Sequence, residues 1–273
     1  MGKYALSKLF LKKKRARKHK KTRARIRIGM RKSFCMCVTA VITAFIAAVG
    51  LCIKALRAPI AVADFQDGNM RIVIDAGHGG VDGGVVGKRT GVKESDLNLE
   101  IAYLLKDELT DMGFDVALTR KTDAGLYGAA TKGFKKRDMQ KRKEIIDECD
   151  PVLVISIHQN YYPAQKYRGG QVFYRAEHAQ GECLGNAIQE RLNELYEQEN
   201  AKPRTAMTGD YFLLNCTEAP SVIVECGFLS NAEDEKLLCD KVWKRKLVGA
   251  ISSGVTSFLT ETSAPSFSLC EKV

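Results

Sequence analysis

The sequence predicts an α/β fold, a mostly parallel sheet with helices on both faces, preceded by one N-terminal transmembrane helix. From residue 70 onward, short apolar runs alternate with longer segments of helical periodicity, which is the pattern of strands joined by helices. Residues 33–53 carry no charge and are long enough to cross a hydrocarbon core of roughly 30 Å. Residues 1–32 contain fifteen lysines or arginines and no acid, which favours a cytoplasmic N-terminus.

The net charge of +11 belongs to the N-terminal tail and not to the folded domain. Without the fifteen basic residues of 1–32, the remaining 28 basic residues face 32 acidic ones, so residues 33–273 are net −4. No nucleic-acid partner is therefore expected. The tail is interpreted as a topology signal that can also contact anionic lipid.

Composition divides the chain into five segments. A cleaved signal peptide is the alternative to a retained anchor, because Ala61-Val62-Ala63 has the small-x-small form of a cleavage site. The apolar run is longer than a usual signal core, and Lys54 and Arg57 separate it from that site, so we expect retention. The predicted location is the cell membrane, with one span and the folded domain outside the cytoplasm. The segments are a basic cytoplasmic tail (1–32), an anchor (33–53), a linker (54–69), the folded domain (70–262) and a flexible C-terminal tail (263–273).

Six short apolar runs predict the strands of the sheet. Runs of this length bounded by turn residues are typical of buried strands. The first ends in a glycine-rich turn, and the third, PVLVISI, fits the pattern best. The predicted strands are 71–75, 114–118, 151–157, 171–175, 211–215 and 221–225.

Four segments with apolar residues at three- and four-residue spacing predict helices. The first has Ser95 as its predicted N-cap and Gly113 as its C-terminal stop. The second is highly charged with a thin apolar side, and a long loop at 120–134 precedes it. The predicted helices are 96–112, 134–149, 177–198 and 240–259.

Two of the four histidines and one carboxylate fall where predicted strands end. His78 follows the first strand, His158 follows the third, and Glu225 ends the sixth. Open α/β sheets bind ligands beyond the carboxyl ends of their strands, and core packing does not explain this placement. Two histidines with a nearby carboxylate predict a catalytic metal site, which uses three nitrogen or oxygen ligands and leaves one position for water.

The third ligand of this site is left open by the spacing of residues. Glu94 lies in the turn before the first helix and is the first choice. The helix dipole alone also favours an acid near a helix N-terminus. On the sequence pattern alone, this structural interpretation of Glu94 is preferred to a role as metal ligand. Asp75 and Asp82 are rival carboxylates that spacing does not exclude.

Glu225 ends an apolar strand, where a charged group is costly unless it has a partner or a task. Beside a metal-bound water such a carboxylate can accept a proton and return it, and the alternative is a salt-bridged glutamate. Other chemistries fit poorly. The sequence has no GxSxG, its glycines lack the spacing of a phosphate loop or dinucleotide fingerprint, and Cys226 has no adjacent histidine.

Four sequence blocks, in order, resemble the signature blocks of zinc-dependent N-acetylmuramoyl-L-alanine amidases, which cut stem peptides from bacterial cell-wall glycan. The resemblance covers about residues 70–260. It implies that His78, Glu94 and His158 are zinc ligands and that Glu225 is the catalytic acid/base. The blocks are DAGHGG (75–80), ESDLNL (94–99), SIHQN (156–160) and ECGFLSN (225–231).

Two shorter stretches, LTR (118–120) and TKGF (131–134), resemble the germination-specific spore-cortex subgroup of this family. That subgroup carries a short N-terminal membrane segment, and some clostridial members depend on a lipoprotein partner. The resemblance therefore implies action on peptidoglycan of the spore cortex. Asn160 is a candidate substrate contact, and Arg120 is either a second one or, as we favour, part of a surface ion pair.

The chain departs from the family pattern at Ala76 and Ser95, where proline and lysine are common, and neither position carries the chemistry. Two other functions stay open on the sequence. A zinc-dependent module could grip wall peptides without cutting them, but it would not need Glu225. A zinc peptidase could cut another bond of the stem peptide, which the mass of the product would distinguish.

Overall fold

The computed structural model describes residues 70–263. The predicted cytoplasmic tail, transmembrane anchor and linker, together with all but the first residue of the predicted C-terminal tail, lie outside the described residues. Among residues 70–263, no helix combines the length and the apolar character needed to cross a membrane. The anchor and the membrane location therefore stay predictions.

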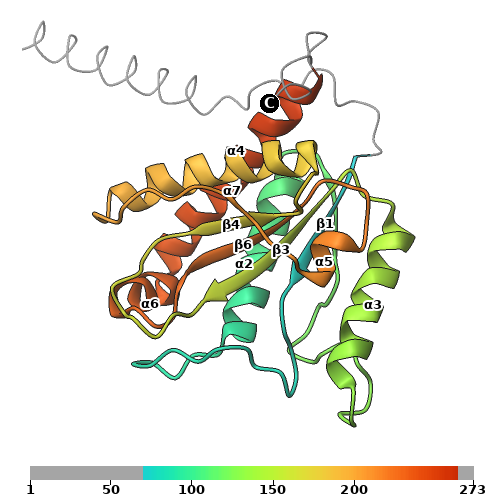
Figure 1. Cartoon of the computed structure of the whole chain (residues 1–273), viewed down its shortest axis with the longest axis horizontal. Helices are drawn as coiled ribbons and strands as arrows, with labels where there is room; N and C mark the ends of the chain where they lie inside the picture. Colours follow the sequence, from blue (N-terminus) through green and yellow to red (C-terminus); the bar gives the residue numbers. More distant parts are fainter. Residues whose placement is uncertain (1–69, 264–273) are drawn as a thin grey trace, which may run out of the picture. The chain divides into compact units, whose positions relative to one another are not determined.

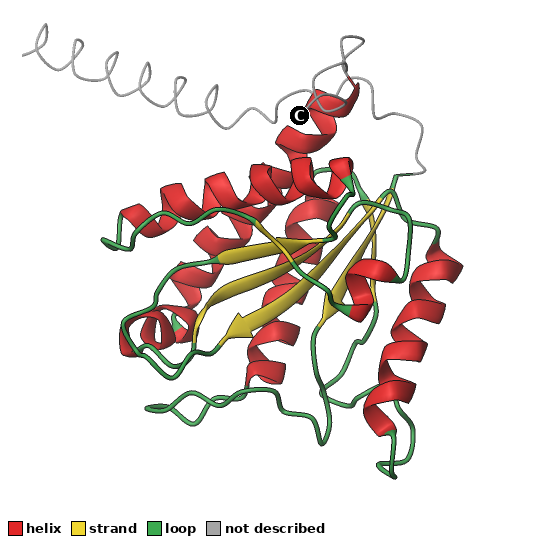
Figure 2. Ribbon diagram, in the orientation of Figure 1, coloured by secondary structure: helices red, strands yellow, loops and turns green. Residues whose placement is uncertain are grey.

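The domain is built around a sheet of six strands: β1 (Arg71–Ala76), β2 (Asp115–Leu118), β3 (Leu153–Asn160), β4 (Gln171–Tyr174), β5 (Met207–Thr208) and β6 (Ser221–Phe228). Their order across the sheet is β2-β1-β3-β6-β4-β5. Figure 2 shows the strands of this sheet in yellow. The first four in this order run parallel, whereas β4 is antiparallel to β6 and pairs with β5 in parallel. The prediction of a mostly parallel sheet is confirmed.

Both faces of this sheet carry helices, as predicted. They are α2 (Glu94–Asp111), α3 (Phe134–Cys149), α4 (Ala179–Glu197), α5 (Phe212–Asn215), α6 (Ala232–Cys239) and α7 (Lys241–Ser263). α2, α4 and α7 pack together on one face, whereas α3 and the short α5 lie on the other (Figure 1). The site described below lies on the α3 and α5 side, at the carboxyl ends of the parallel strands.

Two apolar cores, one on each face, hold these layers together. The larger core lies under α2, α4 and α7 and takes Ile72 and Ile74 from β1. The smaller core takes Val73 from the same strand and Val154 from β3, and Leu213 of α5 packs against them. Side chains alternate between the faces of a strand, so the unbroken apolar run of β1 supplies both cores.

Residues 211–215 form the short helix α5 and not the strand that the apolar run predicted. Leu213 and Leu214 are neighbours and both are buried, at 5% and 1% exposed. A strand lying on one sheet face would bury only every second side chain. The prediction of a strand was wrong because a run of four apolar residues is too short to distinguish a buried strand from one helical turn.

The first helix begins two residues earlier than predicted, because Ser95 is not its N-cap. α2 starts at Glu94, and Lys93 occupies the cap position without a side-chain hydrogen bond. The Ser95 backbone N–H donates instead to the carbonyl of Gly83, at 3.1 Å. The glycine-containing loop before α2 therefore satisfies the start of this helix. The sequence pattern also did not predict β5 or α6; the side chain of Asn231 caps α6 by accepting two backbone N–H groups.

Candidate functional site

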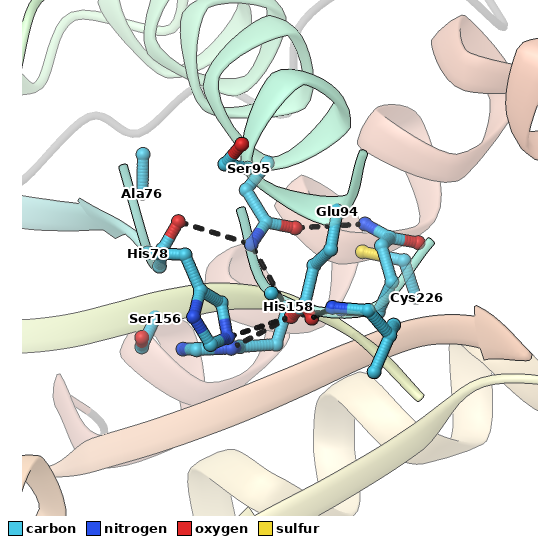
Figure 3. A network of polar contacts seen from close by, with 12 residues as sticks. Ala76, His78, Glu94, Ser95, Ser156, His158 and Cys226 are labelled. Atoms are coloured by element: carbon cyan, nitrogen blue, oxygen red, sulfur yellow. Dashed lines mark hydrogen bonds and ion pairs between the residues drawn. The ribbon is translucent and has the colours of Figure 1, made fainter. Parts of the chain in front are cut away.

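Three side chains from separate elements meet at the carboxyl edge of the sheet (Figure 3). His78 follows β1, Glu94 opens α2, and His158 lies in β3. Oε1 of Glu94 lies 3.2 Å from Nε2 of His78 and 3.0 Å from Nδ1 of His158. One nitrogen or oxygen atom of each residue lies within 4.8 Å of those of the other two, so the three could hold one metal ion together.

The loop after β1 brings its backbone against the ring of His158. A Cβ atom on Gly77 would lie 2.2 Å from Cε1 and 2.3 Å from Nε2 of His158, so only glycine fits without moving the ring. His78 itself has a φ of 62°, a left-handed conformation that is uncommon outside glycine. The backbone of this loop thus sets the position of both imidazoles.

Backbone and side-chain donors surround the Glu94 carboxylate. The N–H of Val85 donates to Oε2 at 2.9 Å, and the N–H of Gln159 donates to Oε1 at 3.1 Å. Burial alone would raise the pKa of Glu94, but hydrogen bonds and charge from His158 and His78 hold it well below its usual value. Glu94 is therefore an ionised acceptor in the middle of the group. It is both the helix-terminal acid and the potential ligand that the sequence offered as alternatives.

Asp82, one of the two rival carboxylates, lies beside His78 and outside the ligand group. Its Oδ2 is 3.2 Å from Nδ1 of His78 and 3.3 Å from Nζ of Lys135. His78 therefore has a carboxylate at each ring nitrogen, with Nε2 toward Glu94. A carboxylate on the far nitrogen commonly fixes the tautomer and orientation of a ligand histidine.

Asp75, the other rival carboxylate, is 1% exposed and fully engaged inside the fold. It accepts hydrogen bonds from the hydroxyls of Thr119 and Ser156, at 2.6 and 2.7 Å, and forms an ion pair with Arg142. Burial opposes ionisation, but the charge of Arg142 and the two hydroxyls lower the pKa of Asp75. Asp75 is thus a structural anion, and the carboxylate that lies with His78 and His158 is that of Glu94.

The buried guanidinium of Arg142 holds the backbone of the loop that carries His78, a role that the sequence did not indicate. Its guanidinium donates to the carbonyl of Ala76 at 2.8 Å and to that of His78 at 2.6 Å, and it pairs with Asp138 at 2.7 Å. The side chain is 1% exposed, although α3 is one of the most charged segments of the chain. Nothing in helical periodicity marks one arginine of such a helix as buried.

Glu225 lies on β6 directly beside His158 on β3. Its Oε2 is buried without a hydrogen-bond partner, and no lysine or arginine among residues 70–263 forms an ion pair with it. Burial raises the pKa of Glu225 to about 7, against the opposing charge of His158. The salt-bridged alternative is therefore not what the described part of the chain shows. A buried carboxyl that exchanges its proton near neutral pH suits general acid and base chemistry.

A cavity of about 280 Å³ opens beside these groups. Glu225, His78 and His158 line it, and so do Tyr211, the N-cap residue of α5, and Phe212 of α5. Cys226 is 0% exposed, and burial raises the pKa of its thiol, so it is not an activated nucleophile. The cavity therefore offers a substrate a carboxyl group and a metal-ligand group side by side.

Arg120 does not lie in the surface ion pair that we favoured from the sequence. Its side chain is 2% exposed, so it is not part of a surface ion pair, and that interpretation was wrong. Its guanidinium donates to the carbonyls of Ala76, Thr122 and Ser95, at 2.7–2.8 Å, and so braces the loop. A contact between Arg120 and substrate stays a prediction. Asn160 ends β3 and does not line the cavity, and its role in substrate binding stays a prediction.

The residues present fit a catalytic divalent metal. Two imidazole nitrogens and one carboxylate oxygen are the donor set of sites that keep a position open for water. Glu94 is held ionised, Asp82 orients His78, and the unpartnered Oε2 of Glu225 is buried in the same neighbourhood. Together these groups can bind an oxygen-bearing substrate and move a proton next to it.

Comparisons with known proteins agree with this arrangement. The germination-specific N-acetylmuramoyl-L-alanine amidase of Bacillus subtilis is 36% identical over 197 residues, covering 71% of this chain and 81% of the relative. The N-acetylmuramoyl-L-alanine amidase AmiA of Escherichia coli is 25% identical over 233 residues, covering 70% and 76%. The solved CwlD amidase of Clostridioides difficile, in complex with the GerS lipoprotein, aligns with a TM-score of 0.67 at 35% identity, covering 70% of this chain and 99% of that one.

A family model described as N-acetylmuramoyl-L-alanine amidase matches residues 72–257, from β1 into α7. The match includes every residue of the site described above. The chain belongs to the N-acetylmuramoyl-L-alanine amidase family and is a hydrolase of that type.

Proposed function

We propose that this enzyme uses zinc to hydrolyse the amide between N-acetylmuramic acid and L-alanine in peptidoglycan of the spore cortex. The observation that carries the proposal is the His78–Glu94–His158 group with the unpartnered carboxyl of Glu225 beside it. When bound, zinc would supply an acidified water and a Lewis acid for the scissile carbonyl. Glu225 accepts a proton during attack on the lactyl carbonyl and returns it to the departing amine of L-alanine.

The cortex assignment rests on the germination-specific relative of Bacillus subtilis, and a lipoprotein partner is suggested by the complex in which the CwlD structure was solved. An N-terminal anchor would confine the enzyme to wall next to the membrane. A module that only binds wall peptides would share the ligand group, but it would have no use for a buried, unpartnered Glu225. A zinc peptidase acting on another stem-peptide bond would yield a different product.

Mass spectrometry of a purified muropeptide incubated with the protein tests the proposal. With zinc added, we expect release of an intact peptide that begins at L-alanine, and we expect a chelator to abolish that release. If the metal acts in catalysis, adding zinc back to the chelated sample restores the release of the peptide. A peptide beginning at a later residue would replace the amidase with a peptidase, and product that survives chelation would remove the metal from the proposal.

Gly77→Ala tests whether the loop backbone places His158. The added Cβ would lie 2.2–2.7 Å from three atoms of the ring, so the ring must move from its position in contact with Glu94. We expect zinc affinity to fall roughly 10- to 100-fold, as when a group that orients a ligand is removed. Competition with a chromophoric chelator measures this affinity.

Gly249→Ala in α7 is the matched control, because nothing lies within 4 Å of a Cβ at that position. It should bind zinc as the parent does. Equal affinity in the parent and in Gly77→Ala would show that His158 tolerates displacement or is no ligand.

A further inference from the structure

The cavity beside the catalytic groups has a wall of two neighbouring aromatic side chains. Tyr211 and Phe212, which we call the α5 wall, are 42% and 47% exposed, although both are large and apolar. Both line the cavity that Glu225, His78 and His158 also line. Exposed aromatic surface that borders a catalytic cavity commonly marks a binding site.

The α5 wall is held in place by the residues around it. Leu213, at 5% exposed, anchors α5 in the core beneath α3. The Tyr211 ring packs edge-on against Phe173 of β4, with centroids 5.5 Å apart at an angle of 69°. A Cβ atom on Gly209 would lie 2.4 Å from Cε2 of Tyr211, so this glycine makes room for the ring. A surface ordered before binding loses little entropy when a ligand arrives.

The charges that line the cavity argue against a carboxylate-bearing ligand on this side. Lys135 is the one lysine or arginine of the lining, and its Nζ pairs with Asp82 at 3.3 Å. Asp75, Asp138 and Glu225 also contribute to the lining. Arg142 pairs with both Asp75 and Asp138, so the side chains of the lining offer no unpaired cation to the free carboxylates of a stem peptide. The muramoyl group is uncharged in the substrate, because its lactyl carboxyl is part of the scissile amide.

We propose that Tyr211 and Phe212 form a stacking surface for the pyranose ring of the N-acetylmuramoyl group, on the sugar side of the bond that is cut. The apolar C–H face of a pyranose can pack on an aromatic ring, and Tyr211 and Phe212 offer two exposed rings at the cavity. The inference rests on the proposed amidase function and adds to it the direction in which substrate lies. The sugar lies toward α5, and the peptide leaves the cavity away from it.

Two substrates with the same stem peptide test this directly. One carries N-acetylmuramic acid, and the other carries only a D-lactoyl group in its place, so both contain the same amide. We expect the parent enzyme, used as the full chain with zinc, to have the higher kcat/KM for the muramoyl substrate. Tyr211→Ala and Phe212→Ala should each reduce this preference roughly two- to tenfold, while kcat/KM for the lactoyl substrate stays near that of the parent.

Two variants serve as controls for this test. Tyr211→Phe retains the ring and should retain the preference for the muramoyl substrate. Tyr162→Ala removes a tyrosine that is 50% exposed but does not line the cavity, and it should leave both substrates unaffected. Equal losses on both substrates in Tyr211→Ala would overturn the proposal and assign the wall to the peptide side or to the fold.

A binding measurement separates this inference from the proposed function. Calorimetry on Glu225→Gln compares the affinities of the muramoyl and lactoyl peptides without turnover. A sugar-dependent gain in affinity that Tyr211→Ala removes supports the subsite even if the parent cleaves neither peptide. Equal affinities for both peptides in Glu225→Gln would refute the subsite even if the parent is an active amidase.

Discussion

Glu225→Gln is expected to lower kcat by about 10²- to 10⁴-fold, the range supplied by a positioned acid or base. The amide has nearly the shape of the carboxyl but accepts no proton, so both the attack and the departure of L-alanine lose their proton carrier. Zinc affinity should stay within a few-fold of the parent, since Glu225 is not in the ligand group. Turnover of a defined muropeptide and chelator competition measure the two quantities.

The pH profile of kcat/KM adds a second readout for Glu225. Its pKa is about 7 in the protein without metal, because the side chain is buried. A bound dication favours the ionised carboxylate, so we expect the acid limb of the parent to have its midpoint below pH 7. A base is protonated and inactive below its pKa, so activity falls as the pH falls, and Glu225→Gln should lose this limb.

Glu218→Gln is the matched control, because the Glu218 side chain is 90% exposed and pairs only with Arg175 at the surface. It should turn over substrate as the parent does. Near-normal turnover by Glu225→Gln would require another residue to be the acid and base.

Arg142→Met is expected to destabilise the domain by about 3–5 kcal/mol, the usual cost of breaking a buried ion pair from one side. The methionine fills much of the same space but leaves the carboxylates of Asp75 and Asp138 buried without their cation. It also releases the carbonyls of Ala76 and His78, so zinc affinity should fall together with stability. Urea unfolding of parent and variant measures the change.

The sign of the pH dependence follows from the lowered pKa of Asp75. A carboxyl with a depressed pKa stabilises the folded state above its unfolded pKa of about 4, and that contribution is lost as the pH falls. The difference between parent and Arg142→Met should therefore be largest near neutral pH and shrink in acid. A constant difference would mean that the arginine acts through packing alone.

Lys141→Met, one position away on α3, is the control for Arg142→Met. Lys141 forms an exposed pair with Glu144, with side chains 47% and 46% exposed, and solvent screens such pairs so that they contribute little to stability. A loss in Lys141→Met as large as in Arg142→Met would show that α3 depends on its total charge and not on the buried pair.

The sequence predicted that His78, His158 and Glu225 would lie at one edge of the sheet, because the ends of strands are visible in it. His158 and Glu225 directly follow or end apolar runs, His78 comes two residues after β1, and parallel strands place those ends together. Glu94 could not be assigned in the same way, because an acid at a helix start has a local explanation. Only the fold shows that its carboxylate turns inward to both imidazoles.

The sequence did not predict the features whose environment is set by distant parts of the chain. Arg142 and Arg120 are buried because carbonyls and carboxylates from other segments surround them, and no local pattern carries that information. β4 reads as an ordinary strand, and its antiparallel direction depends on how the chain crosses the sheet. The segment 211–215 is too short for its apolar residues to show either a helical or a strand period.

The three potential ligands lie at positions 78, 94 and 158, on segments that only the folded chain brings together. An unfolded chain would hold a metal there far less well, so loading and folding are coupled thermodynamically. A hundredfold excess of zinc over its Kd would stabilise the folded state by about 2.7 kcal/mol. A chelator would then lower the melting temperature as well as inhibit the enzyme, and the melting temperature would vary with the supply of zinc.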